Sequence, residues 1–124
     1  MATIVPTITY PNAARGDGST VLVVWTPVTE NDTCRPVSYP EMSDKSVHVS
    51  GTFGGASVAV NGSNNSGASY AALNDPSSTA IAITSEKIKA VLENTALVQP
   101  SPTGGSGQSL TISMLFHLTN PLRT

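Results

Sequence analysis

The residues of this sequence that could perform chemistry are few and far apart. His48 and His117 are the only histidines, and each falls on the polar side of a segment in which apolar and polar residues alternate. They could therefore face each other across a pair of strands. A metal site needs further ligands at suitable spacing, and the sequence places none beside them. We predict two half-exposed histidines and no metal site.

A carboxylate pair and a serine motif are the other candidates for catalysis. Glu41 and Asp44 are close in sequence, but glycosidases need two carboxylates that converge on a cleft. Gly67-Ala68-Ser69-Tyr70-Ala71 approaches the nucleophile elbow of hydrolases, yet it ends in Ala and lacks a strand–turn–helix context. Cys34 has no motif around it and is interpreted as an incidental thiol. The sequence therefore predicts no catalytic residue, no cofactor and no enzyme.

Two kinds of short motif have ordinary explanations, and one loop leaves a binding function open. Arg15-Gly16-Asp17 matches the integrin-binding tripeptide but sits in a natural turn. Asn-X-Ser/Thr sequences begin at Asn31, Asn61 and Asn64, as an Asn- and Ser-rich composition produces by chance. The loop from Asn61 to Ser69, with Tyr70 after it, could bind a sugar by stacking, which leaves carbohydrate or receptor binding open as an alternative function.

Composition favours one nearly neutral domain over residues 1–124. A chain of 124 residues can bury a single core without disulfides, and its one cysteine excludes an internal disulfide. Charged residues make up 11% of the chain and the net charge is −2, so that no basic field favours nucleic acid. The longest apolar run, Val21 to Trp25, is too short to span a bilayer. The first residues do not resemble a signal peptide, so we expect no membrane partner and a cytosol-like compartment.

The segment Thr20 to Thr26 has the most strand-like sequence in the first half of the chain, because β-branched residues dominate it. Alternate residues of a strand face opposite sides, so that one face would carry Val21, Val23 and Trp25, and the other Leu22 and Val24. Both faces are apolar. We therefore predict a strand that is buried on both sides or lies at an interface.

A clearer strand pattern follows the glycine-rich turn at 104–107. Its inward positions would be Leu110, Ile112, Met114 and Phe116. The outward positions are polar except for Leu115, which we interpret as a contact with a neighbour. A second hairpin is predicted where Val47 and Val49 lead to Gly54-Gly55 and the chain returns through Val58 and Val60.

The rest of the chain predicts one helix and a long loop. Ser85 to Glu93 predicts a short helix, since Ser85 can cap it and Ile88, Val91 and Leu92 have i, i+3, i+4 spacing. Residues 27–45 hold three prolines and predict a long ordered loop. Seven or eight short strands, Gly/Pro turns and one helix indicate an all-β fold, an antiparallel β-sandwich or jelly roll.

The first eleven residues form a segment with two interpretations. Ile4, Val5, Ile8 and Tyr10 need apolar partners, but Pro6 interrupts the strand pattern and excludes a central strand. The segment is either an edge strand of its own domain or an arm that pairs with an exposed edge on a neighbouring subunit or shell.

Between Val47 and Leu118 the sequence resembles a family of small virion proteins of tailed bacteriophages. The matching residues are Phe53-Gly54-Gly55 through Gly62-Ser63-Asn64, Leu73-Asn74-Asp75-Pro76, Ile88 to Glu93, and Gly104-Gly105-Ser106-Gly107 into Leu110-Thr111-Ile112. Two positions depart from the family: Tyr70 stands where it tends to carry Trp, and Gln99 where it tends to carry Arg before the proline. Residues 1–45 show no similarity to it.

The resemblance implies a function. Such proteins are structural components of the virion, and those that decorate heads bind the outer capsid and clamp neighbouring capsomers. We therefore expect a capsid decoration or cement protein on the virion surface, assembled in the host cytoplasm. Its expected partners are the major capsid protein and further copies of itself, in a homodimer or homotrimer. The alternative is a carbohydrate- or receptor-binding module of a phage tail or fibre. The expected contact residues are Ile4, Val5, Ile8, Tyr10, Leu22, Val24, Trp25 and Leu115.

Overall fold

The structure is a computed structural model that describes residues 2–10 and 20–118. The described residues form strands and turns and contain no helix. The strands are β1 (Thr3–Ile4), β2 (Thr7–Thr9), β3 (Thr20–Thr29), β4 (Thr33–Cys34), β5 (Asp44–Thr52), β6 (Ser57–Ser63), β7 (Ala71–Ala72), β8 (Lys87–Ala90), β9 (Leu97–Thr103) and β10 (Ser109–His117). The predicted all-β class is confirmed. The Arg15-Gly16-Asp17 turn lies outside the described residues.

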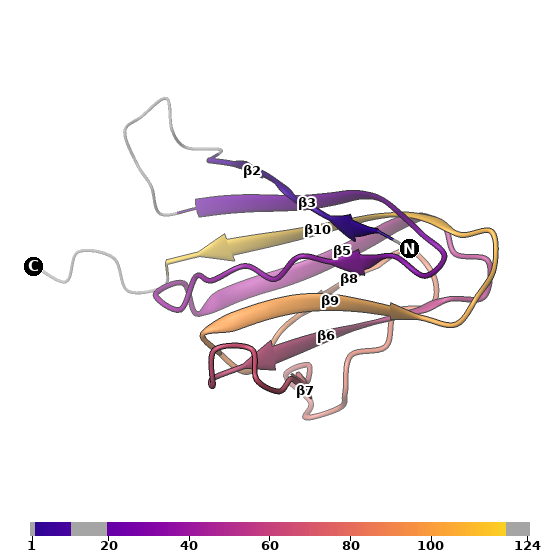
Figure 1. Cartoon of the computed structure of the whole chain (residues 1–124). Helices are drawn as coiled ribbons and strands as arrows, with labels where there is room; N and C mark the ends of the chain where they lie inside the picture. Colours follow the sequence, from indigo (N-terminus) through magenta and orange to yellow (C-terminus); the bar gives the residue numbers. More distant parts are fainter. Residues whose placement is uncertain (1, 11–19, 119–124) are drawn as a thin grey trace, which may run out of the picture.

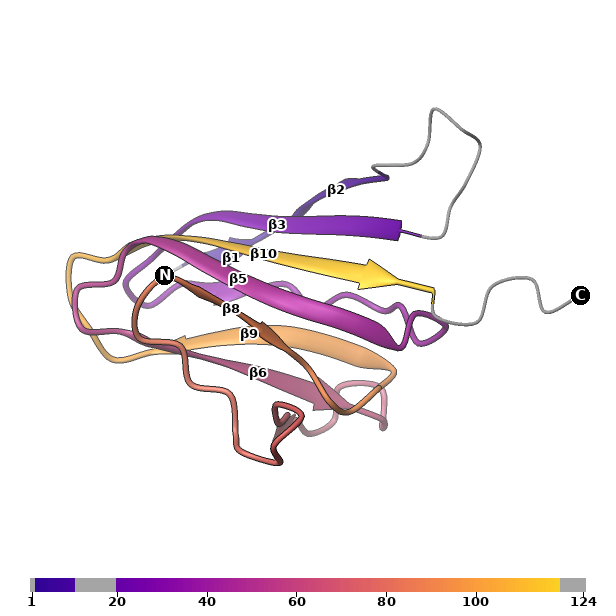
Figure 2. The same cartoon turned by 180° about the vertical axis from the view of Figure 1, so that it is seen from behind.

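Two antiparallel sheets account for most of the strands. The larger has five strands in the order β2-β3-β10-β5-β8, and the smaller has three in the order β7-β6-β9. The predicted hairpin about Gly54-Gly55 is therefore wrong, because β5 and β6 belong to different sheets and this turn connects the two layers. The larger sheet lies above β9 and β6 in Figure 1, and β8 runs along its edge in Figure 2. A third pairing joins β1 to β4 in parallel. The chain therefore folds into two layers, with β1 and β4 at one side.

The core lies between the two sheets. The side chains of Leu110, Ile112, Met114 and Phe116 in β10 are fully buried, and they share one cluster with Val58, Val60 and Val98 from the smaller sheet. The outward residues of β10 are half-buried or exposed. This alternation confirms the predicted orientation of the C-terminal strand. It follows from the period of two, which directs every second side chain to the same layer.

The predicted helix over Ser85 to Glu93 is wrong. This segment holds β8, an edge strand that pairs with β5 through registers such as His48 with Ile88. Ile88 is 63% exposed, whereas Val91 is buried, so the two residues do not share the single apolar face of a helix. A helix of two turns is marginal in isolation. Pairing with a long neighbouring strand stabilises the extended form instead.

The predicted loop over 27–45 also needs correction. β3 continues to Thr29, β4 occupies Thr33–Cys34, and β5 begins at Asp44. β9 runs on through Pro100 and Pro102, which pair with Val60 and Val58. β9 is an edge strand of its sheet, and an edge strand tolerates a residue without an N–H donor on its open side.

Residues 2–10 pair within their own domain, as the edge-strand interpretation predicts. Arg35 donates its backbone N–H to the carbonyl oxygen of Ile4 over 3.0 Å, and Thr7–Thr9 pair with β3 through registers such as Ile8 with Val23. Ile4 packs against the core cluster. The N-terminal segment is therefore paired within its own chain along both β1 and β2.

Candidate functional site

The structure does not bring the two histidines together. Across β10 and β5, His48 lies opposite Ser113, whereas His117 lies opposite Asp44, four residues further along. The His48 Nε2 atom lies 3.1 Å from Glu86 Oε2, and His117 Nδ1 lies 3.0 Å from Thr20 Oγ1. Within residues 2–10 and 20–118 no group of three or more His, Cys, Asp or Glu side chains could hold a metal ion.

The two candidate nucleophiles are Ser69, which takes part in a loop hydrogen bond, and Cys34, which is buried. Ser69 Oγ accepts a hydrogen bond from the Asn65 amide over 2.9 Å, which closes the loop on itself. Cys34 is 1% exposed. Burial, followed by the charge of Asp32, raises the pKa of the Cys34 thiol to about 12. A thiol of this pKa remains protonated at neutral pH, and the thiol is a far weaker nucleophile than the thiolate.

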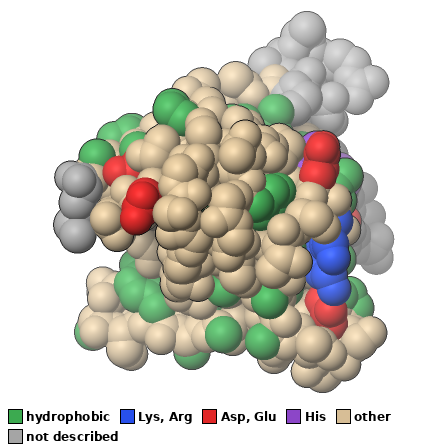
Figure 3. All heavy atoms as spheres, turned by 90° about the vertical axis from the view of Figure 1, so that its right-hand side faces the viewer, with side chains coloured by type: hydrophobic (Ala, Val, Ile, Leu, Met, Phe, Trp, Pro, Cys, Tyr) green, Lys and Arg blue, Asp and Glu red, His purple; other side chains and the backbone are tan. Residues whose placement is uncertain are grey.

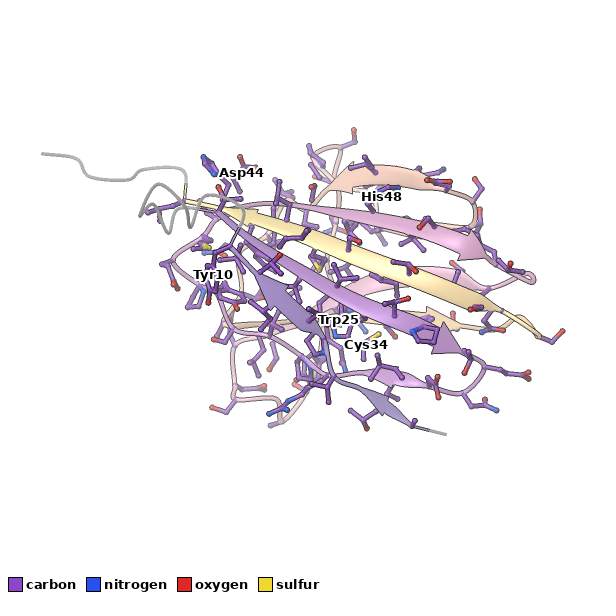
Figure 4. The ribbon with its side chains drawn as sticks, turned by 90° about the horizontal axis from the view of Figure 1, so that it is seen from above. Tyr10, Trp25, Cys34, Asp44 and His48 are labelled. Atoms are coloured by element: carbon purple, nitrogen blue, oxygen red, sulfur yellow. The ribbon has the colours of Figure 1, made fainter. Side chains whose placement is uncertain are left out.

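The carboxylates at 41 and 44 do not converge on a cleft. Glu41 lies in an exposed turn and Asp44 is an exposed residue at the start of β5. Figure 4 shows Asp44 at the same end of the five-stranded sheet as Tyr10, while His48 lies farther along β5. Neither carboxylate is among the residues that line the two hollows described below.

The buried lysine in β5 also has a structural environment. Lys45 is 2% exposed, and its Nζ donates to the carbonyl oxygens of Ser43 and Glu93 and to Asn94 Oδ1 over 3.1–3.3 Å. Three oxygen acceptors satisfy the three N–H groups of an ammonium. This side chain therefore fastens the segment after β8 to β5.

The outward face of the five-stranded sheet, here called the outer face, carries an apolar centre. Leu22 and Val24 of β3 lie opposite Leu115 and Ser113 of β10. Leu115 is 40% exposed, and Leu22 and Val24 are half-buried. A hydroxyl-rich border surrounds them, made of Thr7, Thr9, Thr26, Ser46, Ser50, Thr111 and Ser113. An apolar centre with an uncharged polar rim is the usual anatomy of a protein–protein interface.

Charge is sparse on the outer face and uneven on the molecule. His48 and Glu86 form a pair beside β8, and Asp44 and His117 occupy the end of the sheet. Figure 3, a view of another side, shows mostly uncharged surface, with the Lys and Arg side chains gathered in one column. The centre of the outer face therefore loses little charge solvation when a partner covers it.

A second surface is a groove at the N-terminal edge. Its volume is about 370 Å³, and it is lined by Val5, Pro6 and Ile8 on one side and by residues 35–39 on the other. Val5 is 64% exposed and Ile8 is 41% exposed. Nearby, the Tyr39 ring packs against that of Phe116 in a tilted arrangement, with ring centroids 5.2 Å apart and an angle of 44° between the ring planes. Burial, the charge of Tyr10 and a side-chain hydrogen bond with Tyr10 raise the pKa of Tyr39.

The structure divides the expected contact residues into these two surfaces and the core. Leu22, Val24 and Leu115 lie on the outer face, whereas Val5, Ile8 and Tyr10 lie at or near the groove. Ile4 is half-buried. Trp25 is fully buried, and its Nε1 donates to the carbonyl oxygen of Arg35 over 2.9 Å. Figure 4 shows it beside Cys34 beneath β3. Trp25 therefore belongs to the core and not to a contact surface.

Arg35 and Tyr39 line the groove, and neither is among the contact residues predicted from the sequence. Both fall in the segment that was interpreted as a loop. Alternation from Arg35 to Tyr39, with Val37 inward, was the available signal, since Val37 is buried and bridges Val98. Pro36 in the middle of these residues obscured that pattern.

A polar hollow lies beside the loop that was considered for sugar binding. It has a volume of about 300 Å³ and is lined by Gly62, Ser63, Asn64, Asn65, Ser69, Ala71, Leu73 and Thr95. Asn64 Oδ1 accepts the backbone N–H of Ala96, and Asn65 Oδ1 accepts hydrogen bonds from Ser63 and Ser69. Tyr70 is half-buried, and its hydroxyl lies near Gly67.

No protein-family model matches the chain, and a search of curated proteins finds no match. Among the described residues no helix is long and apolar enough to cross a membrane.

Proposed function

We propose that this chain is a non-enzymatic structural protein that binds the outer surface of a viral capsid and stabilises the shell as a decoration or cement protein. The observation that carries the proposal is the presence of apolar side chains on two separate surfaces: Leu115 with the half-buried Leu22 and Val24 on the outer face, and the exposed Val5 and Ile8 at the N-terminal groove. A protein that links neighbours in a shell needs two separate contact surfaces. The resemblance to tailed-phage virion proteins supplies the identity of the shell.

The outer face suits association with another copy of the chain. Five strands about 4.8 Å apart, each about 30 Å long at most, span roughly 600 Å². A standard interface buries about 800 Å² per partner, so that a stable pair needs the whole of the outer face together with the side chains at its border. An uncharged face can meet a copy of itself without like-charge repulsion. We therefore assign self-association, as a homodimer or homotrimer, to Leu22, Val24 and Leu115.

We assign the groove to contact with the major capsid protein. Val5, Ile8 and Tyr10 are exposed there, and they lie near an edge strand, which can pair with another chain. In this arrangement each copy holds a neighbour through one surface and the shell through the other. The two sheets with a shared core support a β-sandwich architecture, within which a jelly-roll order of strands remains our proposal.

Binding to particles that lack the protein tests this function. Purified chain, mixed with heads from a deletion mutant of the encoding virus, should sediment with them in a saturable amount. Val5→Asp should reduce the bound amount at least tenfold, because it places a charge in the proposed shell contact. Glu30→Gln, an exposed substitution outside both surfaces, is the matched control. Heads that bind no more chain than a buffer blank would contradict the proposal.

The polar hollow favours a second candidate, carbohydrate or receptor binding on a tail or fibre. The hollow has a suitable size, but the side-chain oxygens that border it already accept hydrogen bonds within the chain: Asn64 Oδ1 from Ala96, and Asn65 Oδ1 from Ser63 and Ser69. Tyr70 is also packed near Gly67, which limits stacking on a sugar. A glycan array should therefore show no hits. Specific hits that Tyr70→Ala abolishes would favour this candidate over capsid decoration.

A further inference from the structure

The groove arises because two parallel strands separate. β1 pairs with β4 through Thr3 with Thr33 and Ile4 with Cys34. Beyond this pairing the N-terminal segment turns to β3, where Thr7–Thr9 form β2. The other segment turns to β9, where Val37 exchanges two backbone hydrogen bonds of 2.9 Å with Val98. The two extended segments thus form a fork, and the groove of about 370 Å³ lies between its branches.

One branch of the fork is an open sheet edge. β2 is the terminal strand of the five-stranded sheet and pairs only with β3 among the described strands. Because β3 occupies one edge of β2, the other edge is directed towards the fork. An exposed edge carries N–H and C=O groups that can pair with an added strand. Main-chain pairing of this kind provides affinity, and a neighbouring pocket selects a side chain.

The lining of the fork indicates which side chains fit. Val5, Pro6 and Ile8 present apolar surface from one branch, and Pro36, Val37 and Tyr39 present it from the other. Arg35 also lines the groove and is exposed. The ion pairs within the described residues are His48–Glu86 and Lys89–Asp75, so that the Arg35 guanidinium forms none there. It is therefore available to a carboxylate from outside, with which Arg makes short, charge-assisted hydrogen bonds.

We propose that the fork binds an extended segment of another protein, which pairs with the open edge of β2, inserts an apolar side chain into the groove and places a carboxylate against Arg35. This proposal rests on the proposed function in one respect only: the protein that we expect to provide the extended segment is the shell protein.

A second copy of this chain is a poor donor for the fork. The other edge of the five-stranded sheet is β8, which carries Lys87 and Lys89. Pairing β8 with β2 of a neighbour would bring a strand with two lysines to the groove that holds Arg35, and like charges across an interface disfavour binding. The edge strand β9 contains Pro100 and Pro102, which lack the N–H groups that pairing needs. An acidic, apolar segment of a different protein fits better.

Amide chemical shifts of the ¹⁵N-labelled full chain test the proposal without any viral particle. The probe is the acetylated and amidated peptide Thr-Val-Glu-Val-Thr at millimolar concentration. We expect saturable shifts at residues 7–9 and 35–39. The peptide Thr-Val-Lys-Val-Thr should bind at least fivefold more weakly, and a version N-methylated at alternate residues should not bind. Shifts that are absent from these residues, or equal for the Glu and Lys peptides, would overturn the proposal.

Two variants separate a binding role from a structural one. Arg35→Gln should remove the preference for the Glu peptide over the Lys peptide while leaving the spectrum of the free protein otherwise unchanged. Leu115→Asp lies on the outer face and should leave peptide binding unaltered. If Arg35→Gln keeps the full preference, the carboxylate assignment is wrong. If the chain does not bind heads but still binds the peptide, capsid decoration is wrong, whereas the proposal that the fork binds an extended segment stands.

Discussion

Leu22 of β3 and Leu115 of β10 lie directly opposite each other in the five-stranded sheet, and both point away from the core. Their neighbours in sequence, Val21, Val23, Met114 and Phe116, are fully buried on the other side of the same strands. The pair therefore adds nothing to the core of its own domain. Its position at the centre of a face with few charges is the basis on which we propose self-association.

Leu115→Asp should abolish self-association, because it places a charge at the centre of the proposed contact. We expect sedimentation velocity to show a concentration-dependent dimer or trimer for the unmodified chain at micromolar concentration and a monomer for the variant. A loss of at least tenfold in affinity is expected, since burying an unpaired charge costs several kcal/mol. Val5→Asp lies at the groove and is the control. A monomeric unmodified chain would count against the outer-face assignment.

The strand pattern of β10 could be predicted from the sequence because the strand is long and faces a core on one side only. The two faces of β3 were also separated correctly: Val21, Val23 and Trp25 are buried and Leu22 and Val24 are not. The role of Trp25 was not predictable in the same way. Its position in the alternation shows which way it points but does not show whether a second sheet or a partner covers that side.

Segments whose conformation depends on distant pairing could not be predicted. The β8 segment has helix-compatible spacing, and only its pairing with β5 makes it extended. The groove depends on the separation of β1 and β4, whose paired residues are thirty positions apart in sequence. No local pattern contains that information. The sequence therefore predicted contact residues such as Val5 and Leu115 without showing that they lie on two separate surfaces.

Gly51 should tolerate substitution much less than Gly104. Gly51 has a φ of 109°, and a Cβ atom there would overlap the backbone carbonyl oxygen of Ser109. Gly104 has a φ of 70° with no atom within 4 Å of such a Cβ. We expect Gly51→Ala to lower the free energy of unfolding by more than about 2 kcal/mol and Gly104→Ala by about 1 kcal/mol. Urea unfolding followed by circular dichroism measures both. Equal effects would show that the β5–β10 contact is looser than described.

The carboxylate of Asp75 should make stability depend on acid pH. Hydrogen bonds from the Thr79 backbone, Lys89 and the Ser77 backbone lower the pKa of Asp75 below its ordinary value of 3.8. The folded-state pKa is the lower one, so its stabilising effect is complete above pH 3.8 and is lost as pH falls through the folded-state pKa. Asp75→Asn should therefore melt at a lower temperature than the unmodified chain at pH 7, with the difference shrinking in acid. A difference that is constant with pH would contradict this role.

Cys34 should be inert in the folded protein. Its thiol is buried, and its pKa is raised to about 12. At pH 8 we expect a disulfide reagent such as 5,5′-dithiobis(2-nitrobenzoic acid) to react with the folded chain at least a hundredfold more slowly than with the chain in urea. Rapid reaction of the folded chain would mean that the segment around β4 opens readily, and the fork beside it would then not be a preformed site.

The copy number and position of the chain on purified particles directly test whether the chain is a capsid decoration protein. Quantitative mass spectrometry of virions, combined with a low-resolution reconstruction of the particle, gives both quantities. If the chain decorates the capsid, we expect hundreds of copies per particle, with density on the outside of the head at the junctions between capsomers. If the chain is absent from the particle, or if only a few copies are present and are confined to the tail, the proposal of capsid decoration is wrong.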